Sequence, residues 1–345
     1  MIMAIIDRIR QTIATVAPDK VFVITDSNVA VVESRLIEAL DAAYVAVVEA
    51  GEEHKGIAEV ARIAGELSAR GATRRSLIIC IGGGMVTDLG GFVAAIFKRG
   101  IPHINVATTL LGGVDASVGG KTGVDLGGLK NELGAFHMPL EVFADTESFA
   151  SLPPVEILSG FGEIIKTAFL AGDDMTRRIL GLDPMEATPS MLEDICVFCR
   201  DEKMRVVEAD PTEKGLRKVL NLGHTAGHAM ETLMLERGTP AAHGVAVAHG
   251  LLVALILSNM ECGLDSAWVS RYASWLRSYY PAIPFSCRDY ADLWRIARHD
   301  KKNAGTADVL NFVLLASPGH PVTDVAIDRS RFESALDIYQ ELQGR

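Results

Sequence analysis

The segment GLRKVLNLGHTAGHAME, residues 215–231, carries polar side chains at helical spacing. If it forms one helix, Arg217, Asn221, His224 and His228 lie at i, i+4, i+7 and i+11 and share one face. A guanidinium, an amide and two imidazoles cannot form a core stripe, because each buried polar group would need a partner. Solvated helix faces usually carry Lys and Glu instead. We therefore interpret this segment as one wall of an active site.

Two glycines interrupt the same segment. Gly223 and Gly227 each lower the helix propensity by about 1 kcal/mol relative to Ala. Close approach of a ligand or of another backbone would explain both glycines, and we expect such a contact at these positions.

Histidines are concentrated around this segment, and they suggest a metal site. His224, His228, His243 and His249 lie close together along the chain, and Glu163 is the nearest plausible carboxylate partner. Two imidazoles and a carboxylate with one open position form a metal site that can polarise hydroxyls or carbonyls. Spacing alone does not choose between His224 and His228, or between His243 and His249. The HTAGH pattern lacks the adjacent Glu of the zinc proteases, which argues against that activity.

A second group of candidates follows the apolar run SLIICI, residues 76–81, which predicts a buried strand. The glycines at 82–84 and Asp88 come next, where a strand turns into a helix. Such a turn lets a backbone approach a pyrophosphate at the positive end of a helix. The spacing is not GxGxxG, so a tight turn without a ligand is the alternative. Residues 51–55, GEEHK, could offer carboxylates to a ribose and a cation to a phosphate.

The segment 99–139 is rich in glycine and polar residues, and we expect a long irregular loop there. Loops of this length are usually functional. Its lysines do not lie on an amphipathic helix, so we interpret them as holders of phosphate and carboxylate groups. The candidate residues in it are Thr108, Thr109, Asp115, Lys121, Lys130 and Asn131.

The elements that position these residues fall into two groups. Apolar strands at 20–25, 44–49 and 76–81 alternate with helical pattern, including an amphipathic helix at 57–70 closed by Gly71. This alternation predicts a parallel sheet with helices on both faces, which binds ligands beyond the carboxyl ends of its strands.

Helical pattern dominates after residue 152. We therefore expect an N-terminal Rossmann-like α/β domain over residues 1–152 and a C-terminal helical domain over 153–345. The second domain opens with SGFGEIIKTAFL, where Glu163 and Lys166 lie at i, i+3 on one helix face.

Composition excludes several classes of function. The chain has 345 residues and a formal net charge of −11, which argues against nucleic acid binding. The N-terminus lacks the features of a signal peptide, and the apolar run 245–257 is too short to span a bilayer. Five cysteines without framework spacing fit a reducing compartment. Cys196 and Cys199 form a CxxC inside a helical pattern, where we expect buried helix residues. We expect a soluble, cytoplasmic protein.

Taken together, several motifs in order resemble the 3-dehydroquinate synthases of the sugar phosphate cyclase superfamily, over residues 25–315. The motifs are GGGMVTDLGGF, KRGIPHINVATTLLGGVDASVGGKTGVDLGGLKNELGAF, GFGEIIKTAFL, GLRKVLNLGHTAGHAME, AAHG and HDKKN. The resemblance implies a Rossmann-like domain that binds NAD and a helical domain that binds one divalent metal, zinc or cobalt. It also implies a homodimer, because Arg99 matches a residue that reaches the phosphate site of the neighbouring subunit.

The resemblance also implies a role for each matching residue. The metal ligands would be Glu163, His224 and His243, with His228 on the substrate side. Residues matching substrate-binding positions are Asp115, Lys121, Asn131, Lys166, Lys203, Arg217, Asn221 and His228. Lys130 and Lys302 match phosphate-side cations, although Lys301 adjoins Lys302. Residues matching NAD-binding positions are Asp26, Asn28, Glu52, Lys55, Gly83, Gly84, Asp88, Thr108, Thr109, Lys121 and Lys130.

The reaction implied by the resemblance belongs to the shikimate pathway. It converts 3-deoxy-D-arabino-heptulosonate 7-phosphate into 3-dehydroquinate and phosphate. Transient oxidation by NAD is followed by β-elimination of phosphate, reduction and an intramolecular aldol closure, with no net redox change. Two positions depart from the family pattern: Val245 replaces an acidic residue, and Thr87 replaces a small one.

Two other enzymes remain as alternatives. A sister cyclase would act on a sugar phosphate without the carboxylate, but retention of Lys203, Arg217 and Asn221 favours the acid. A metal-dependent dehydrogenase of the glycerol type would accumulate NADH and would not need so many cations. A binding protein without enzymatic activity would need neither the cations nor the metal ligands.

Overall fold

The structure is a computed structural model that describes residues 2–127, 129–299 and 308–344. It divides into two compact units, Met1–Pro153 with Thr188–Met204 and Pro154–Ala187 with Arg205–Arg345. The division of the sequence after residue 152 places Thr188–Met204 in the second domain, whereas this segment clusters with the first unit. Most of helix α8, Pro189–Ala209, lies in it. Division along the chain could not anticipate a helix that returns to the first unit.

Five parallel strands form the sheet of the first unit, in the order β2-β1-β3-β4-β7. The apolar runs that predicted strands β1, β2 and β3 are confirmed, and β3 is buried along its whole length. Strands covered on both faces need such continuous apolar runs. The bounds are Val21–Asp26 for β1, Tyr44–Val48 for β2, Leu77–Gly82 for β3, His103–Ala107 for β4 and Val142–Ala144 for β7.

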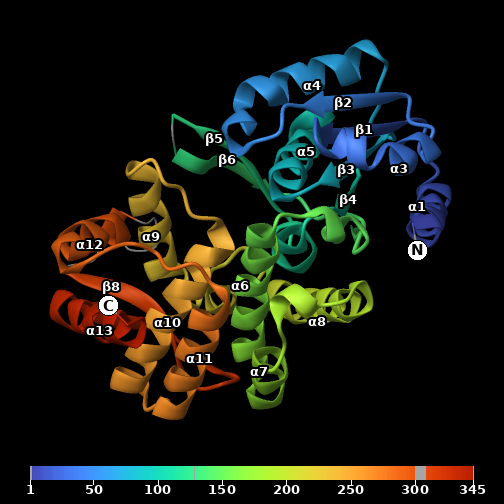
Figure 1. Ribbon diagram of the computed structural model, residues 1–345. Coiled ribbons are helices and arrows are strands. Elements are labelled where there is room, and N and C mark those ends of the chain that lie inside the picture. Colours follow the sequence, from blue (N-terminus) through green and yellow to red (C-terminus); the bar gives the residue numbers. More distant parts are fainter. Residues whose placement is uncertain (1, 128, 300–307, 345) are drawn as a thin grey trace. The chain divides into compact units, whose positions relative to one another are not determined.

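Helices cover both faces of this sheet, as the alternating pattern predicted (Figure 1). Phe22 and Ile24 of β1 pack in the apolar cluster with helices α4, Ile57–Ala69, and α5, Gly84–Ile96. Val23 points to the opposite cluster, which contains residues of α1, Ile2–Val16, and α3, Ser34–Ala39. A short helix α2, Val29–Val32, follows β1. At the carboxyl ends of the strands lie the turns that follow them.

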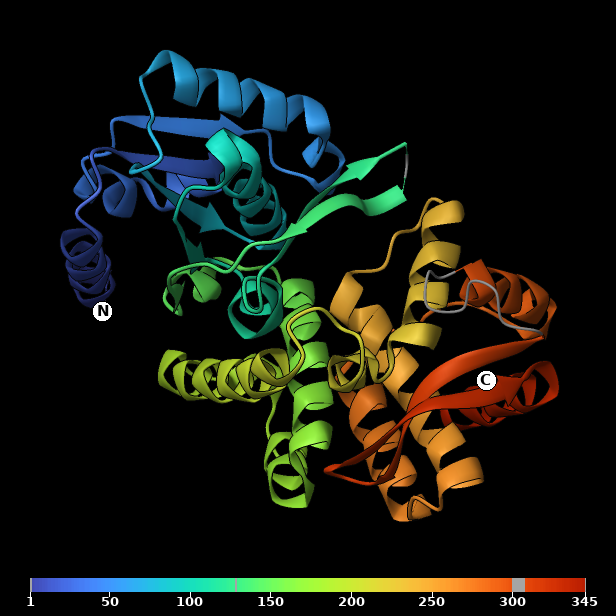
Figure 2. The same ribbon diagram turned by 180° about the vertical axis from the view of Figure 1, so that it is seen from behind.

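The segment 99–139 is not an irregular loop, so that prediction was wrong. It contains β4 and the antiparallel hairpin of β5, Lys121–Leu126, and β6, Leu129–Phe136, drawn in green in Figure 2. Its glycines serve strand pairing: a Cβ at Gly123 would lie 2.8 Å from the Leu133 carbonyl oxygen, and one at Gly134 would lie 2.7 Å from the Thr122 oxygen. A π-helical turn, η3, spans Gly112–Ala116.

The second unit is mainly helical, with one antiparallel hairpin that the sequence pattern did not predict (Figure 2). The hairpin is formed by β8, Val309–Ser317, and β9, His320–Asp328. The helices are α6, Pro154–Ala171; α7, Asp173–Leu180; α9, His224–Glu236; α10, His243–Cys262; α11, Ser266–Tyr279; α12, Tyr290–His299; and α13, Arg329–Leu342. Short 3₁₀ turns are η1, Glu52–His54; η2, Phe97–Arg99; η4, Ser148–Ser151; η5, Pro184–Glu186; η6, Leu216–Asn221; and η7, Cys287–Asp289.

Helix α10 is the central core helix of the second unit and is longer than the predicted apolar run. Every residue from Gly244 to Ser258 is buried. By length and composition this helix could cross a membrane, but 78% of its most apolar window is buried inside the protein. Packing against neighbouring helices therefore accounts for its apolar character.

The two cysteines of the CxxC pattern are buried on α8, with exposed fractions of 1% for Cys196 and 0% for Cys199. Neither forms a disulfide with another cysteine of the described residues. The expectation of buried helix residues is confirmed.

Candidate functional site

The segment 215–231 does not form one helix, and the predicted continuous face is wrong. The 3₁₀ turn η6 ends at Asn221, and α9 begins at His224. Gly223 between them has a φ of +79°, in the left-handed region that favours glycine. Arg217 therefore lies on a separate turn, while His224 and His228 keep their i, i+4 relation on α9.

The predicted close backbone approach at both glycines of this segment is confirmed. A Cβ at Gly223 would lie 3.0 Å from the backbone of Leu251, and one at Gly227 would lie 3.0 Å from the carbonyl oxygen of Ala246. Both neighbours belong to α10. The glycines thus let α9 lie directly against the core helix.

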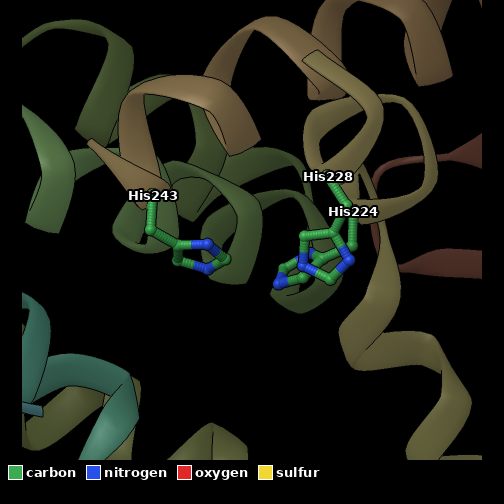
Figure 3. Close-up of side chains that lie close together, drawn as sticks. All are labelled: His224, His228 and His243. Carbon is green, nitrogen blue, oxygen red and sulfur yellow. The ribbon is translucent and has the colours of Figure 1, made fainter. Parts of the chain in front are cut away.

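Three imidazoles face one another at the start of α9 and α10 (Figure 3). His224 and His228 come from α9, and His243 is the first residue of α10. Each offers one ligand nitrogen, and these nitrogens lie within 4.8 Å of one another. The separation is small enough for one ion to contact more than one ring.

A buried carboxylate from α6 lies beside this cluster. Glu163 is fully buried, and its Oε1 lies 3.4 Å from the Nε2 atoms of both His224 and His243. Within the described ranges neither carboxylate oxygen accepts a hydrogen bond of good geometry, although Oε2 forms an ion pair with Lys166. Burying an ionised carboxylate is costly unless a cation compensates it. This donor set fits a divalent metal held by one carboxylate oxygen and two imidazole nitrogens.

The charges around this cluster are strongly coupled. Burial opposes ionisation of Glu163, but Lys166 and His243 hold the pKa of its carboxyl well below the usual range. Burial would also lower the pKa of His243, yet Glu163 and Glu231 raise it above its ordinary value. A metal at this position would replace the proton of His243, since an imidazole binds metals in its neutral form.

His249 lies outside this cluster, and its partners decide the alternative that spacing left open. It is fully buried. Its Nε2 lies 2.9 Å from the Pro281 carbonyl oxygen, and its Nδ1 lies 2.8 Å from the Tyr339 hydroxyl. Both ring nitrogens are therefore engaged in core hydrogen bonds. The structure favours His243 over His249 as the metal-facing residue.

Two other candidates of the second unit are buried and do not lie on a solvent-exposed helix face. Lys166 and Arg217 are each 1% exposed. The Arg217 guanidinium donates to the Pro211 carbonyl oxygen at 2.9 Å, and the Asn221 amide donates to Glu213 at 3.0 Å. Lys302 and its neighbour Lys301 lie outside the described residues.

At the sheet edge of the first unit, predicted candidates lie at the end of β1 and just after the ends of β3 and β4. Asp26 ends β1, and its carboxylate accepts from the backbone N–H groups of Asn28 and Val29 at 2.9 and 3.0 Å. The Asp26 side chain therefore holds the turn that leads from β1 into α2.

The glycine-rich turn after β3 lies next to the turn after β4. Gly83 precedes α5, which begins at Gly84, and a Cβ at Gly83 would lie 2.9 Å from the Thr109 side chain. Thr109 accepts from the Gly112 N–H at 3.1 Å, and Thr108 is buried. The close contact favours a glycine before this helix, because a larger residue would displace the Thr109 side chain.

Lys55 is not a free cation at this edge. It is 3% exposed, and its Nζ lies 2.8 Å from Asp88 Oδ2 and 3.1 Å from Glu52 Oε1. Burial alone would lower the pKa of Lys55, but the two carboxylates raise it. Burial raises the pKa of Asp88 to about 6, even though Lys55 opposes the shift. Lys55 therefore offsets part of the negative charge of two carboxylates that could receive ribose hydroxyls.

A second ion pair of the first unit joins α8 to η3. Lys203 donates to the Asp115 carbonyl oxygen at 2.7 Å and lies 2.9 Å from its Oδ1. The segment 188–204, which the sequence assigned to the other domain, thus carries a candidate residue of the first unit.

The remaining candidates of the first unit are exposed. Lys121, Lys130 and Asn131 lie on the β5–β6 hairpin, and Asn131 adopts a φ of +49° with its N–H donating to Asp125 at 2.7 Å. Arg99 also has a positive φ, +70°, at the end of η2. All four residues therefore belong to the first unit and lie on its surface.

Sequence reasoning missed Glu231, whose Oε2 lies 3.1 Å from His243 Nδ1. Its signal was present in the pattern: Glu231 follows His224 by seven residues and His228 by three, so all three share a face of α9.

Comparison with known proteins identifies the family. The family model of the 3-dehydroquinate synthase N-terminal region matches residues 45–159, and that of the C-terminal region matches residues 160–303. A 3-dehydroquinate synthase of Parabacteroides distasonis is 41% identical over 329 residues, covering 94% of this chain and 93% of that protein. One of Oceanobacillus iheyensis is 38% identical over 330 residues, covering 93% and 89%.

Solved structures share the fold. A 2-deoxy-scyllo-inosose synthase complexed with carbaglucose-6-phosphate, NAD⁺ and Co²⁺ matches with a TM-score of 0.84 at 25% identity, over 98% of this chain and 94% of that one. A 2-epi-5-epi-valiolone synthase from Streptomyces hygroscopicus with NAD⁺ and Zn²⁺ bound matches with a TM-score of 0.77 at 22% identity, over 94% and 92%. The predicted fold class is confirmed, and the chain is an enzyme that belongs to the 3-dehydroquinate synthase family.

Proposed function

We propose that this chain converts 3-deoxy-D-arabino-heptulosonate 7-phosphate into 3-dehydroquinate and inorganic phosphate. The observation that carries the proposal is the buried carboxylate of Glu163 facing two imidazoles, in a chain that spans almost the whole length of its 3-dehydroquinate synthase relatives. Membership of the family by itself indicates a small sugar phosphate as the substrate.

We propose Glu163, His224 and His243 as the metal ligands and zinc or cobalt as the metal. When bound, the ion would acidify a coordinated hydroxyl and so favour its oxidation. The role of Lys166 follows from its contact with Glu163: it compensates part of the carboxylate charge and keeps that side chain in place. His228 is left to the substrate side, one helical turn beyond His224.

We propose that the first unit binds NAD at the carboxyl edge of its sheet, where the cofactor would accept a hydride and later return it. The N–H groups at the start of α5 suit a pyrophosphate. The carboxylates of Glu52 and Asp88 suit ribose hydroxyls, and Lys55 offsets part of their negative charge. The other residues proposed for NAD are Asp26, Asn28, Lys55, Gly83, Gly84, Thr108, Thr109, Lys121 and Lys130.

The substrate carries a carboxylate and a phosphate, which accounts for the cations. The residues proposed to hold it are Asp115, Lys121, Lys130, Asn131, Lys166, Lys203, Arg217, Asn221, His228 and Lys302. Arg217 suits an anion because its guanidinium is buried, so an incoming carboxylate would meet little competition from water. Phosphate departs from a substrate that these side chains hold at other points, which keeps the remaining carbon chain in place for ring closure.

We also propose a cytoplasmic homodimer. Arg99 is exposed and held in a left-handed conformation at the end of η2, which presents its side chain outward. In the dimer this side chain would reach the phosphate site of the neighbouring subunit.

One experiment separates this function from the alternatives. The purified protein with NAD and Zn²⁺ is given the heptulosonate phosphate, and released phosphate and absorbance from NADH are followed together. Stoichiometric phosphate without lasting NADH absorbance is the expected result. Lasting NADH would indicate a dehydrogenase of the glycerol type. Release from glucose 6-phosphate but not from the acid would indicate a sister cyclase.

A further inference from the structure

We propose that Glu231 is a positioning residue that orients His243 toward the metal. The inference rests on the metal centre of the proposed function and extends it by one residue. Glu231 lies on α9, its side chain is 13% exposed, and its Oε2 lies 3.1 Å from His243 Nδ1.

The two nitrogens of His243 face different carboxylates. Nδ1 faces Glu231, while Nε2 lies 3.4 Å from Glu163 Oε1. An imidazole that donates its Nδ1–H to a carboxylate carries its lone pair on Nε2. The contact therefore fixes both the tautomer and the rotation of the ring, and it aims the lone pair at the oxygen that would share the metal.

The second imidazole ligand is oriented in another way. His224 Nδ1 lies 3.2 Å from the carbonyl oxygen of Leu222, the residue before the left-handed Gly223. Its side chain is 11% exposed, compared with 33% for His243. Packing and the backbone hold His224, whereas the more exposed His243 depends on a side chain.

One face of α9 thus supplies three functions. His224, His228 and Glu231 lie at i, i+4 and i+7 and so project from the same side of the helix. The first would bind the metal, the second would face the substrate, and the third would orient the ligand contributed by α10.

A solvent-exposed ion pair on the same helix offers a matched control. Glu236 lies 3.5 Å from Arg295, and both side chains are about half exposed. Such surface pairs contribute little and fix no geometry. Glu236 therefore tests whether removing any carboxylate from α9 weakens metal binding.

The experiment compares Glu231→Met and Glu231→Gln, which have similar shape but differ in the hydrogen-bond acceptor. Each purified variant is stripped with a chelator, checked by circular dichroism and titrated with Zn²⁺ against a chromophoric chelator. Loss of an orienting carboxylate typically weakens metal binding ten- to a hundredfold. We expect a loss of Zn²⁺ affinity of about this size for Glu231→Met. We expect a smaller loss for Gln, whose amide oxygen still accepts from Nδ1–H. Glu236→Met should bind like the wild type.

Several outcomes would overturn the proposal. Wild-type affinity in Glu231→Met, or equal losses in Met and Gln, would show that the acceptor does not orient the ring. If the Glu231→Met variant does not fold, Glu231→Asp tests the proposal instead, because aspartate keeps the charge but has a shorter side chain. Wild-type Zn²⁺ affinity in Glu231→Asp would also overturn the proposal. Failure of the wild type itself to bind Zn²⁺ would instead reject the metal centre. The visible spectrum of the Co²⁺-loaded variants gives an independent readout, since a misaimed imidazole changes the ligand geometry.

Discussion

The buried charges of the two units are compensated in different ways. In the first unit, Lys55 pairs with two carboxylates, and Lys203 pairs with Asp115. In the second unit, Glu163 has one lysine partner and otherwise faces two imidazoles, which are neutral when they bind metals. The first arrangement consists of lysine–carboxylate pairs, whereas the second includes imidazoles that can exchange a proton for a metal ion. This difference predicts that metal binding depends on the second unit and tolerates changes at the sheet edge.

The largest expected effect is loss of the metal. Glu163→Ala, His224→Ala and His243→Ala each remove a ligand and should yield protein without stoichiometric zinc, a greater loss than that of an orienting residue. His228→Ala should keep the metal but lose activity. Elemental analysis of the four variants, together with phosphate release, checks this. Metal-free His228→Ala with fully loaded His224→Ala would reverse the assignment of the two imidazoles on α9.

Substrate-binding cations come next, and here the two units should differ in stability. Lys121→Ala and Arg217→Ala each remove a charged hydrogen bond worth about 1.5–3 kcal/mol, so kcat/KM should fall roughly ten- to a hundredfold in both. Lys121 is exposed, and its variant should unfold like the wild type. Arg217 is buried and bonded to Pro211, so its variant should also lose stability. Steady-state kinetics and urea unfolding test the pair, and near-normal kcat/KM in either variant would reject that residue's role.

A buried histidine of the first unit should make stability depend on pH. His103 is fully buried, and neither of its ring nitrogens has a hydrogen-bond partner among the described residues. Burial lowers its pKa to about 3, with a smaller contribution from His137. Between pH 6.5 and 3 the unfolded state therefore binds a proton that the folded state does not, and stability is lost as the pH falls. The expected loss from pH 7 to pH 5 is about 2 kcal/mol.

His103→Phe should remove that dependence, because phenylalanine fills the site without titrating. Urea midpoints at pH 7 and pH 5, measured for the variant and the wild type, check the prediction. An equal loss of stability in both proteins would show that His103 is not the responsible group.

The smallest effect is expected for an exposed pair. Lys218 lies 2.9 Å from Asp324, with side chains 39% and 57% exposed. Lys218→Ala should change the free energy of unfolding by less than about 1 kcal/mol, because water screens such pairs. Urea unfolding measures the change. A larger loss of stability would mean that solvent exposure does not predict which charge pairs contribute little to stability in this protein.

The sequence predicted the central strands well because their burial on both faces requires continuous apolar runs such as that of β3. The β5–β6 hairpin was missed because β6 is mostly exposed and carries no apolar alternation. The break between η6 and α9 was missed because the helical spacing of the polar residues continues across it, whereas the backbone leaves the helix at Leu222, with a ψ of 126°, and at the left-handed Gly223.

The candidate site shows the same limits. Residue types and spacing found the histidines, but the choice between His243 and His249 required their partners, which come from distant parts of the chain. Glu231 was missed although it shares a face of α9 with His224 and His228, because its role depends on a contact with a different helix. The resemblance to a family supplied the residue roles that spacing left open.

Each proposed metal ligand has a glycine as its chain neighbour, and each of these glycines lies against another backbone. A Cβ at Gly162, next to Glu163, would lie 2.0 Å from the Gly244 carbonyl oxygen; Gly244 follows His243, and Gly223 precedes His224. Relief of the clash at Gly162 would need a shift of about 1 Å, whereas a metal site tolerates errors of only about 0.2 Å in its ligand distances. The three glycines therefore act as spacers that set the distances between the backbones carrying the proposed ligands. A single added methyl group would move these ligands apart and should weaken binding of the proposed metal, although every ligand would still be present.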